Sequence, residues 1–293
     1  MQVIDHNKSK GPVFIALASV CWSFGGLFIK FIPWGAMSIV GIRAFLAAVV
    51  FIIYRRSVKI EFTLGNVMTA ICLSSTTVMY VFANKLTTAA AAILLQFTAP
   101  IFIILIYLIF YRKKPTLSAV VAVLLTLFGM LLFFAENLDA GGFLGNILAL
   151  ISGLSMAGVY VCNKRPDTNP ENALFLGFLI NTCIGLPFAF TDVTGDVSAW
   201  VAVIILGVVQ VGCAYIFFSK GIKITSALLA CLISAIEPIL NPIWVLLAGV
   251  WGLLPELEVP GRFALIGGVV IILTVVGYNI WIERSKSDDS LTE

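Results

Sequence analysis

Ten apolar runs, each about 20 residues long, divide this chain almost from end to end. They cover residues 12–31, 34–54, 63–83, 87–110, 116–134, 142–162, 172–191, 198–219, 225–250 and 262–282. A helix of about 20 residues crosses the hydrocarbon core of a bilayer, whereas the strands of membrane barrels are shorter and alternate in polarity. Only 11% of the residues are charged, against about 25% in soluble domains. The runs therefore predict an all-α integral membrane protein with ten transmembrane helices.

Lysine and arginine residues are distributed unevenly over the predicted loops. Ten spans put both termini on one side, and the loops of that side then carry 14 basic residues against three on the other. Cytoplasmic loops hold the excess of Lys and Arg, so both termini are predicted to be cytoplasmic, in the plasma (cytoplasmic) membrane. Residues 284–293 are predicted to be a disordered cytoplasmic tail. The run at 12–31 is predicted to span the bilayer rather than to be a signal peptide, because more membrane segments follow it.

Two stretches of the chain repeat one pattern. Residues 85–100 read KLTTAAAAILLQFTAP and residues 223–238 read KITSALLACLISAIEP. The predicted orientation makes the first stretch run inward and the second outward, which indicates two inverted repeats of five helices, residues 1–138 and 139–283. Many secondary transporters bind their substrate between such repeats. The copies differ chemically at one position, where Ala99 precedes Pro100 but Glu237 precedes Pro238.

The sequence lacks the residues that several functional classes of protein need. The chain has one histidine, His6, and its six cysteines form no CxxC pair, so no metal site, cofactor or enzymatic activity is predicted. A net charge of +3 without a basic stripe excludes nucleic acid as a partner. No nucleotide-binding loop is present, so direct drive by ATP is not expected.

A group of short motifs resembles one known family. These are WSFGGLFIK at Trp22–Lys30, Arg43-Ala-Phe in the second run, the Thr-Thr-Ala-Ala start and Pro100 of the fourth, and EPILNPIW from Glu237 in the ninth. Their order and the five-plus-five layout resemble the ten-helix EamA-like family of the drug/metabolite transporter (DMT) superfamily. The resemblance implies a carrier of small metabolites with a central cavity between the halves. The Gly-Glu pair that often closes the fourth and ninth helices of that family is absent here.

Two charged residues, Arg43 and Glu237, lie well inside predicted spans. An unpaired charge at mid-bilayer costs roughly 2.5–3.5 kcal/mol, so both should face the protein interior or water. At 1.5 Å per residue, Arg43 lies roughly 13 Å and Glu237 roughly 12 Å below the outer surface of a core about 30 Å thick. The two residues are predicted to interact, directly or through a neighbour. Three readings stay open: a fixed ion pair, a pair that couples transport to protons when Glu237 titrates, or separate contacts for each.

Polar and aromatic side chains within the spans are candidates to line a cavity. The resemblance implies a cavity between the first, third, fourth, sixth, eighth and ninth helices, which favours as substrate-binding residues Trp22, Tyr80, Gln96, Tyr160, Gln210 and Trp244. The alternative role for each of these side chains is to join neighbouring helices. Aromatic faces beside amides suit a small flat solute, or an amine through cation–π contact.

Two prolines occupy equivalent mid-span positions in the repeated stretches. Pro100 and Pro238 each remove a backbone hydrogen bond, so they are predicted either to act as hinges or to shape static kinks.

The sequence as a whole predicts a secondary transporter that exports small metabolites, such as amino acids, amines or nucleobases, by alternating access. Protons are a candidate coupling ion, the lipid bilayer is the surrounding medium, and the oligomeric state is open. The alternative is a passive channel or facilitator of the same architecture, although no charged ring or carbonyl filter motif is present.

Overall fold

The computed structural model describes residues 10–25, 28, 32–136, 142–251 and 261–289. Every regular element in these ranges is a helix. The first half holds α1 (Lys10–Trp22), α3 (Ala36–Arg55), α4 (Leu64–Leu86), α5 (Ala89–Gln96), α6 (Ala99–Phe110) and α7 (Leu117–Phe134). The second half holds α8 (Phe143–Cys162), α9 (Pro170–Gly185), the 3-10 turn η1 (Leu186–Phe188), α10 (Ala189–Asp192), α11 (Val197–Ile205), the π-helix η2 (Leu206–Cys213), α12 (Ala214–Ile224), α13 (Ala227–Ile233), α14 (Ile236–Val250) and α15 (Arg262–Asp289).

Eight helical stretches in the described ranges are long and apolar enough to cross a membrane. Two further apolar helices, Lys10–Trp22 and Ala227–Leu240, are shorter and lie within the first and ninth predicted spans. The ninth span is interrupted at Ser234 and Ala235, and the end of the first lies partly outside the described residues. The predicted disordered tail is wrong for residues 284–289, because α15 continues as a helix to Asp289. The rest of that tail, and Asp139, Glu256 and Glu258 of the predicted outer loops, are outside the described residues.

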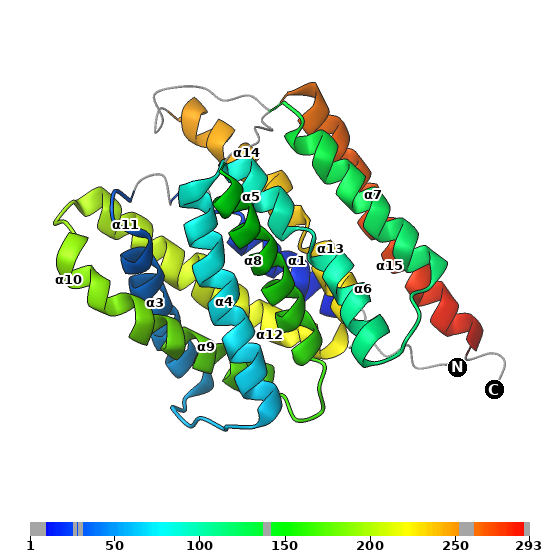
Figure 1. The fold of residues 1–293 in the computed structure, drawn as a ribbon, viewed down its shortest axis with the longest axis horizontal. Helices are drawn as coiled ribbons and strands as arrows, with labels where there is room; N and C mark the ends of the chain where they lie inside the picture. Colours follow the sequence, from blue (N-terminus) through cyan, green and yellow to red (C-terminus); the bar gives the residue numbers. More distant parts are fainter. Residues whose placement is uncertain (1–9, 26–27, 29–31, 137–141, 252–260, 290–293) are drawn as a thin grey trace.

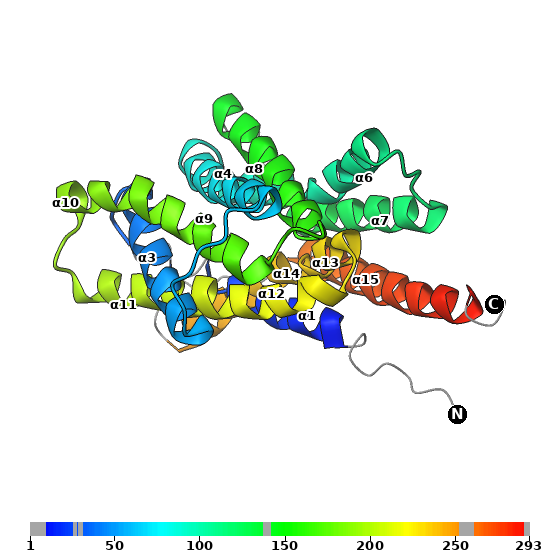
Figure 2. The same ribbon diagram turned by 90° about the horizontal axis from the view of Figure 1, so that it is seen from below.

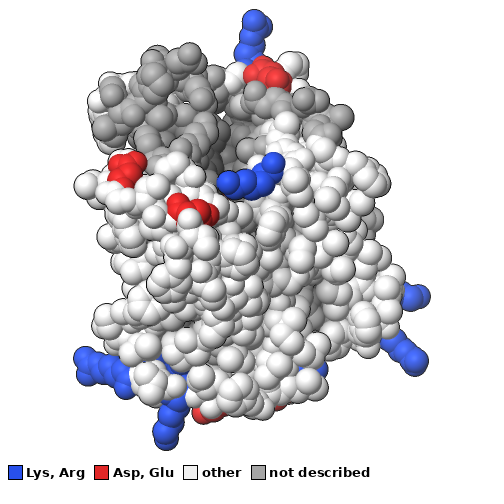
Figure 3. Space-filling model, turned by 60° about the vertical axis from the view of Figure 1, so that its left-hand side comes forward, with Lys and Arg blue, Asp and Glu red and all other residues white. Residues whose placement is uncertain are grey.

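The helices pack in pairs that join the two halves of the chain. In Figures 1 and 2, α4 runs beside α8, α3 beside α9, α1 beside α12, and α7 beside α15. Exposed apolar side chains cover the outer surface, and Figure 3 shows a broad uncharged belt with Lys and Arg gathered at the lower end. Helices that expose apolar side chains in this way fit a hydrocarbon environment.

The repeated stretches have closely similar local structures. Thr88 caps α5 by accepting a hydrogen bond from the Ala91 amide, and Ser226 caps α13 in the same way. Ser and Thr side chains at this position satisfy amides that have no partner within the helix. Each helix then breaks before the repeated proline, between α5 and α6 and between α13 and α14. A proline cannot donate to the carbonyl four residues earlier, so the sequence repeat becomes a repeated helix break.

Two glycine pairs bring helices of opposite halves into close contact. A Cβ atom at Gly267 would lie 2.4 Å from the carbonyl oxygen of Gly129 and 2.5 Å from the backbone nitrogen of Phe133. A Cβ atom at Gly185 would lie 2.5 Å from the nitrogen of Gly41. Only glycine leaves room for such backbone contact. The α7–α15 and α3–α9 crossings therefore depend on these residues.

Candidate functional site

The two intramembrane charges belong to different halves of the bundle. Arg43 lies on α3 and is only 7% exposed, and Glu237 lies partly buried in the first turn of α14. Between described residues, ion pairs within 4.0 Å join Arg165 to Asp167 and Lys223 to Glu171, but none joins Arg43 to Glu237. The direct form of the predicted interaction is thus not found in this conformation.

Two tyrosines lie in the neighbourhood of both charges. Tyr80 on α4 and Tyr215 on α12 each lie within electrostatic reach of both Arg43 and Glu237. An interaction of Arg43 with Glu237 through a neighbour stays a prediction. Tyr215 was not among the sequence candidates, yet a signal for it exists: Tyr-x-Phe-x-x-Lys occurs at Tyr80–Lys85 and again at Tyr215–Lys220. The two tyrosines lie in corresponding helices of the two halves, but they are 135 positions apart rather than the 138 of the repeated stretches, so they are not equivalent positions of the repeat.

Aromatic rings surround Tyr215 on the side of α1. The ring centroid of Trp22 lies 5.1 Å from that of Tyr215 and 5.6 Å from that of Phe218, in edge and tilted contacts. Phe178 on α9 lies 5.5 Å from Tyr215 on another side. Aromatic pairs favour such offset geometries. Trp22 is 4% exposed and its indole Nε1 is buried without a hydrogen-bond acceptor in the described structure.

Gln210 sits in the π-helix η2, where the backbone widens in the middle of the eighth predicted span. Its amide lies against α1, since a Cβ atom at Gly25 would be 3.0 Å from Gln210 Nε2. Its Oε1 atom is buried without a donor among the described residues. Short π-helical segments inside α-helices occur frequently at functional sites. Trp22 and Gln210 thus present a free donor and a free acceptor, and each costs stability unless a partner arrives.

The other three predicted substrate ligands have protein partners. Gln96 Nε2 donates to Ser152 Oγ at 2.8 Å, which ties α5 to α8. The Tyr160 hydroxyl, on a side chain 1% exposed, lies 2.6 Å from Ser234 Oγ at the α13–α14 break. Trp244 Nε1 donates to Ser23 Oγ at 2.7 Å, and its ring stacks on Phe24 at 4.7 Å. These contacts match the helix-joining alternative for all three residues. Sequence reasoning missed Ser23, Ser152 and Ser234, because serines are common in spans and carry no distinguishing pattern.

The two predicted hinge prolines lie just after the helix breaks. Pro100 is at the second position of α6, and Pro238 is at the third position of α14. The residues before them form i to i−3 hydrogen bonds, from Thr98 N to Leu95 O and from Glu237 N to Ser234 O. The breaks are observed; whether the helices move about them stays a prediction.

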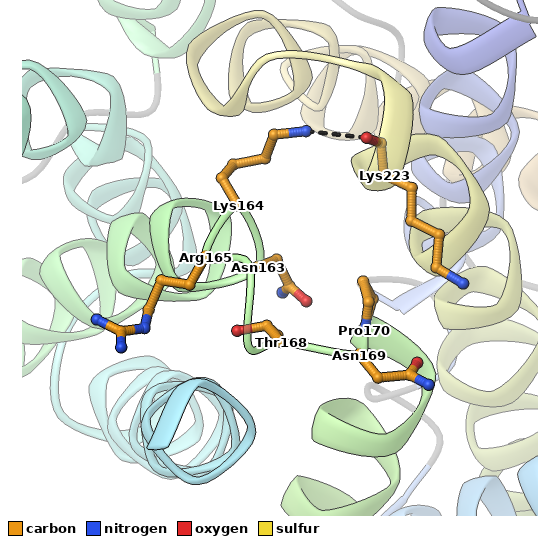
Figure 4. A pocket seen from close by; sticks show the side chains of 7 residues that line it. All are labelled: Asn163, Lys164, Arg165, Thr168, Asn169, Pro170 and Lys223. Carbon is orange, nitrogen blue, oxygen red and sulfur yellow. Dashed lines mark hydrogen bonds between the residues drawn. The ribbon is translucent and has the colours of Figure 1, made fainter. Parts of the chain in front are cut away.

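A cavity of about 390 Å³ opens near the end of α8, lined by Asn163, Lys164, Arg165, Thr168, Asn169, Pro170 and Lys223 (Figure 4). Lys164 Nζ donates to the carbonyl oxygens of Ile222, Lys223 and Thr225 at 2.6, 3.2 and 2.9 Å. A lysine in this position satisfies the last carbonyls of α12 and its helix dipole. Its ammonium group is therefore engaged in the fold.

Polar bonds beside this cavity hold the two halves together. Asp167 accepts hydrogen bonds from Arg165 Nε at 3.0 Å and from the Gly65 amide at 2.9 Å. These donors, the Arg165 guanidinium first, lower the pKa of Asp167 below its usual range. At the opposite end, Asp192 accepts from the Gly35 amide and from Ser38 Oγ, and Trp34 Nε1 donates to Thr194 Oγ1 at 3.0 Å. Hydrogen bonds thus join the two halves at both ends of the interface.

Among the described residues, no group of three or more His, Cys, Asp or Glu side chains is placed to hold a metal ion. The central site offers instead one cation, one anion and several neutral hydrogen-bonding groups, all at the junction of the two halves.

Comparison with known proteins gives matches to a family, to a relative and to solved structures. The model of the EamA-like transporter family matches twice, over residues 9–135 and 143–280. A protein of Archaeoglobus fulgidus described as an uncharacterized transporter is 30% identical over 205 residues, which are 69% of this chain and 71% of that protein. A crystal structure, titled only as that of a protein, superposes with a TM-score of 0.78 over 94% of this chain and 98% of its own, at 19% identity. At that identity the last match concerns the fold alone.

Proposed function

Because this chain belongs to the EamA-like transporter family, and is therefore a multi-pass membrane transporter of small molecules, we propose that it is a secondary transporter that exports small metabolites across the plasma membrane by alternating access. The observation that carries this proposal is the pair of opposite charges at the junction of the halves. Arg43 comes from the first half and Glu237 from the second, and neither has an ion-pair partner among the described residues. A family of transporters and the name of a relative indicate transport rather than enzymatic activity.

The proposed topology is ten spans in two inverted repeats, residues 1–138 and 139–283, with both termini cytoplasmic. The double match of one family model supports the duplication. So does the α7–α15 crossing, because Gly129 and Gly267 are 138 positions apart, the same offset as between the repeated stretches. A residue on a twofold axis meets its own equivalent, and inverted repeats are related by such an axis in the membrane plane.

The proposed movement is a rocking of one half against the other about this axis. The breaks before Pro100 and Pro238 allow the outer parts of the fourth and ninth spans to tilt independently. A solute held between Arg43 and Glu237 contacts both halves, so its binding free energy changes when they separate.

Coupling to protons is proposed to pass through Glu237, the carboxylate that the first repeat lacks. The titratable groups within electrostatic reach of it are Tyr80, Tyr160 and Tyr215. Glu237→Gln removes the proton site while keeping the shape. In vesicles with an imposed pH gradient, the variant should lose gradient-driven uptake but keep exchange at equal pH. Unchanged gradient-driven uptake would rule out coupling through this residue.

Transport itself is tested with purified protein in liposomes loaded with unlabelled solute. A carrier accelerates labelled uptake when the opposite face holds solute, and its rate saturates. Linear flux without this acceleration would favour the passive facilitator, and an absence of flux for every amino acid, amine, nucleobase and sugar tried would reject the export proposal. A thermal-shift screen of the same compounds selects the solutes, since a ligand of the folded state raises the unfolding temperature.

A further inference from the structure

Two cysteines from opposite halves of the chain meet in the interface between α4 and α8. Cys72 lies on α4 and is partly buried, and Cys162 is the last residue of α8 and is 7% exposed. A Cβ atom at Gly158 would lie 2.6 Å from the Cys72 Sγ atom and 3.3 Å from its Cβ atom, so the Cys72 side chain packs directly on the backbone of α8. Cys162 follows Gly158 by one turn on the same helix face. The two thiols are therefore immediate neighbours, and both are free.

Hydrogen bonds fix the register of these two helices independently of the cysteines. Ser75 Oγ lies 2.8 Å from Ser155 Oγ, and Ser152 Oγ donates to the carbonyl oxygen of Thr76 at 3.1 Å. Numbers rise along α4 as they fall along the facing side of α8, so the helices are antiparallel. Figures 1 and 2 show them side by side. The same register places Cys72 opposite Gly158.

Thr69 supplies a hydroxyl group on this face of α4. It precedes Cys72 by three residues and lies on the same side of the helix, where the register sets it opposite Cys162. Its side chain is 0% exposed, and its Oγ1 atom has no hydrogen-bond partner among the described residues. Thr76 on the same helix instead donates to the Cys72 carbonyl oxygen at 2.8 Å, as threonines within helices often do. A buried donor without a partner is costly, and this one is placed to stabilise a thiolate or the oxygen of a sulfenic acid.

The cavity at the end of α8 adjoins Cys162. Asn163 and Thr168 line this cavity (Figure 4). Asn163 directly follows the cysteine, and Thr168 Oγ1 donates to the Cys162 carbonyl oxygen at 2.8 Å. A volume of about 390 Å³ admits a molecule of a few atoms, and the proposed topology places this end of the protein in the cytoplasm. Cys162 is thus the thiol nearer to the entry.

We propose that Cys72 and Cys162 form a site of reversible covalent modification, at which a hydroperoxide oxidises the two thiols to a disulfide. With hydrogen peroxide, the Cys162 sulfur attacks one peroxide oxygen, the O–O bond breaks, and one water molecule departs, which leaves Cys162 as a sulfenic acid. The Cys72 sulfur then attacks the sulfenic sulfur. The S–S bond forms, the S–O bond breaks, and the oxygen departs as a second water molecule with the Cys72 proton. The thiols lose two electrons and the peroxide gains them.

The bond would tie α4 of the first half to α8 of the second. A disulfide needs Cβ atoms about 3.5–4.5 Å apart, which side-chain rotation and a small shift of α8 along α4 supply. Gly158 permits this shift because it presents no side chain to Cys72. A covalent tie between the halves stops them from rocking against each other. This consequence, unlike the bond itself, rests on the proposed transport function.

The unmodified protein, purified in detergent, gives the first test. It is treated with hydrogen peroxide, the remaining thiols are blocked with N-ethylmaleimide, and its peptides are mapped by mass spectrometry with and without dithiothreitol. Cys21 on α1 and Cys213 on η2 are a second pair of neighbouring cysteines. The peptides of Cys72 and Cys162 should be joined at least about tenfold more often than those of this second pair, at a yield independent of protein concentration. Equal yields for both pairs, or oxidation of Cys162 to a sulfinic acid while Cys72 stays free, would overturn the proposal.

Single substitutions assign the roles of the residues. Cys72→Ser and Cys162→Ser should each abolish the joined peptide, with alanine in place of serine if a variant does not fold, whereas Cys183→Ser, at an exposed position, should leave the yield unchanged. In Cys72→Ser the sulfenic acid on Cys162 has no second thiol to attack it and should accumulate, which dimedone labelling detects. Thr69→Val keeps the shape of the side chain and should slow the peroxide reaction of Cys162 about tenfold. Dimedone labelling of other cysteines in place of Cys162 contradicts the assignment, and an unchanged rate in Thr69→Val refutes the role of its hydroxyl.

Liposomes distinguish the modification from the transport function. Peroxide should abolish saturable exchange by the unmodified protein, dithiothreitol should restore it, and Cys72→Ser should keep its exchange in peroxide. A disulfide that forms while exchange continues would leave the modification site standing and reject a rocking movement between α4 and α8. An absence of saturable exchange for every compound, in a protein that still forms the disulfide, rejects the transport proposal alone.

Discussion

The α7–α15 crossing offers a sharp test of the fold, through a single added methyl group. In Gly267→Ala the new Cβ atom would lie 2.4 Å from the Gly129 carbonyl oxygen, 2.5 Å from the Phe133 nitrogen and 2.8 Å from the Phe133 Cα atom. All three are backbone atoms, so no side chain can rotate out of the way. Relief requires the two helices to separate by roughly 1 Å, and a gap of that size forfeits about a quarter to a half of each affected dispersion contact.

The magnitude follows from two opposing effects. Overpacking of a close contact costs about 1–3 kcal/mol, while replacing glycine by alanine in a helix contributes up to about 1 kcal/mol of stability. Gly267→Ala should therefore lower the free energy of unfolding by about 1–2 kcal/mol. Gly277→Ala is the matched control in the same helix, because its Cβ atom meets nothing within 4 Å. Gly268→Ala is a second control, with its nearest contact at an ordinary 3.4 Å.

The assay is thermal unfolding of the three variants in one detergent, followed by circular dichroism and by tryptophan fluorescence. The expected order of unfolding temperature is Gly277→Ala at or above the unmodified protein, Gly268→Ala close to it, and Gly267→Ala clearly below. If Gly267→Ala unfolds no earlier than Gly277→Ala, then α7 and α15 do not approach each other as described, and the argument for a twofold axis at this crossing fails with it.

Four further substitutions test the polar contacts. Tyr160→Phe should cost about 1 kcal/mol of stability by losing the bond to Ser234, and solute affinity should stay unchanged; a large fall in affinity with normal unfolding would return Tyr160 to the binding site. Trp244→Phe should cost a similar amount, and a double-mutant cycle with Ser23→Ala should show that the two losses are not additive; additive losses would disprove the bond. The pKa of Asp167 is lowered in the folded protein. The ionised carboxylate therefore stabilises the fold fully at pH values above those at which carboxyl groups usually titrate, and this stabilisation is lost as the pH falls through the lowered pKa. Asp167→Asn should therefore unfold earlier at neutral pH and show a flatter acid limb in a pH series of unfolding temperatures; identical pH profiles would refute this role.

The site was predictable only in part, for a reason that lies in the composition of the helices. Arg43 and Glu237 were identified from sequence, because a charge inside an apolar run is conspicuous. The position of Tyr215 in the neighbourhood of both charges was not identified. Side-chain direction is read from amphipathic periodicity, and helices that are apolar on every face offer no such period.

What the sequence by itself determined is the set of membrane segments and the local design of the repeated stretches. Length and hydropathy define the spans, and Thr88, Ser226, Pro100 and Pro238 define where helices start and break, since capping and proline geometry act within one turn. The tertiary structure alone decided which polar groups are used to join helices and which have no hydrogen-bond partner among the described residues. That choice depends on how each helix is rotated against its neighbours, and the rotation is set by contacts such as Gly129 with Gly267 between residues far apart in the chain.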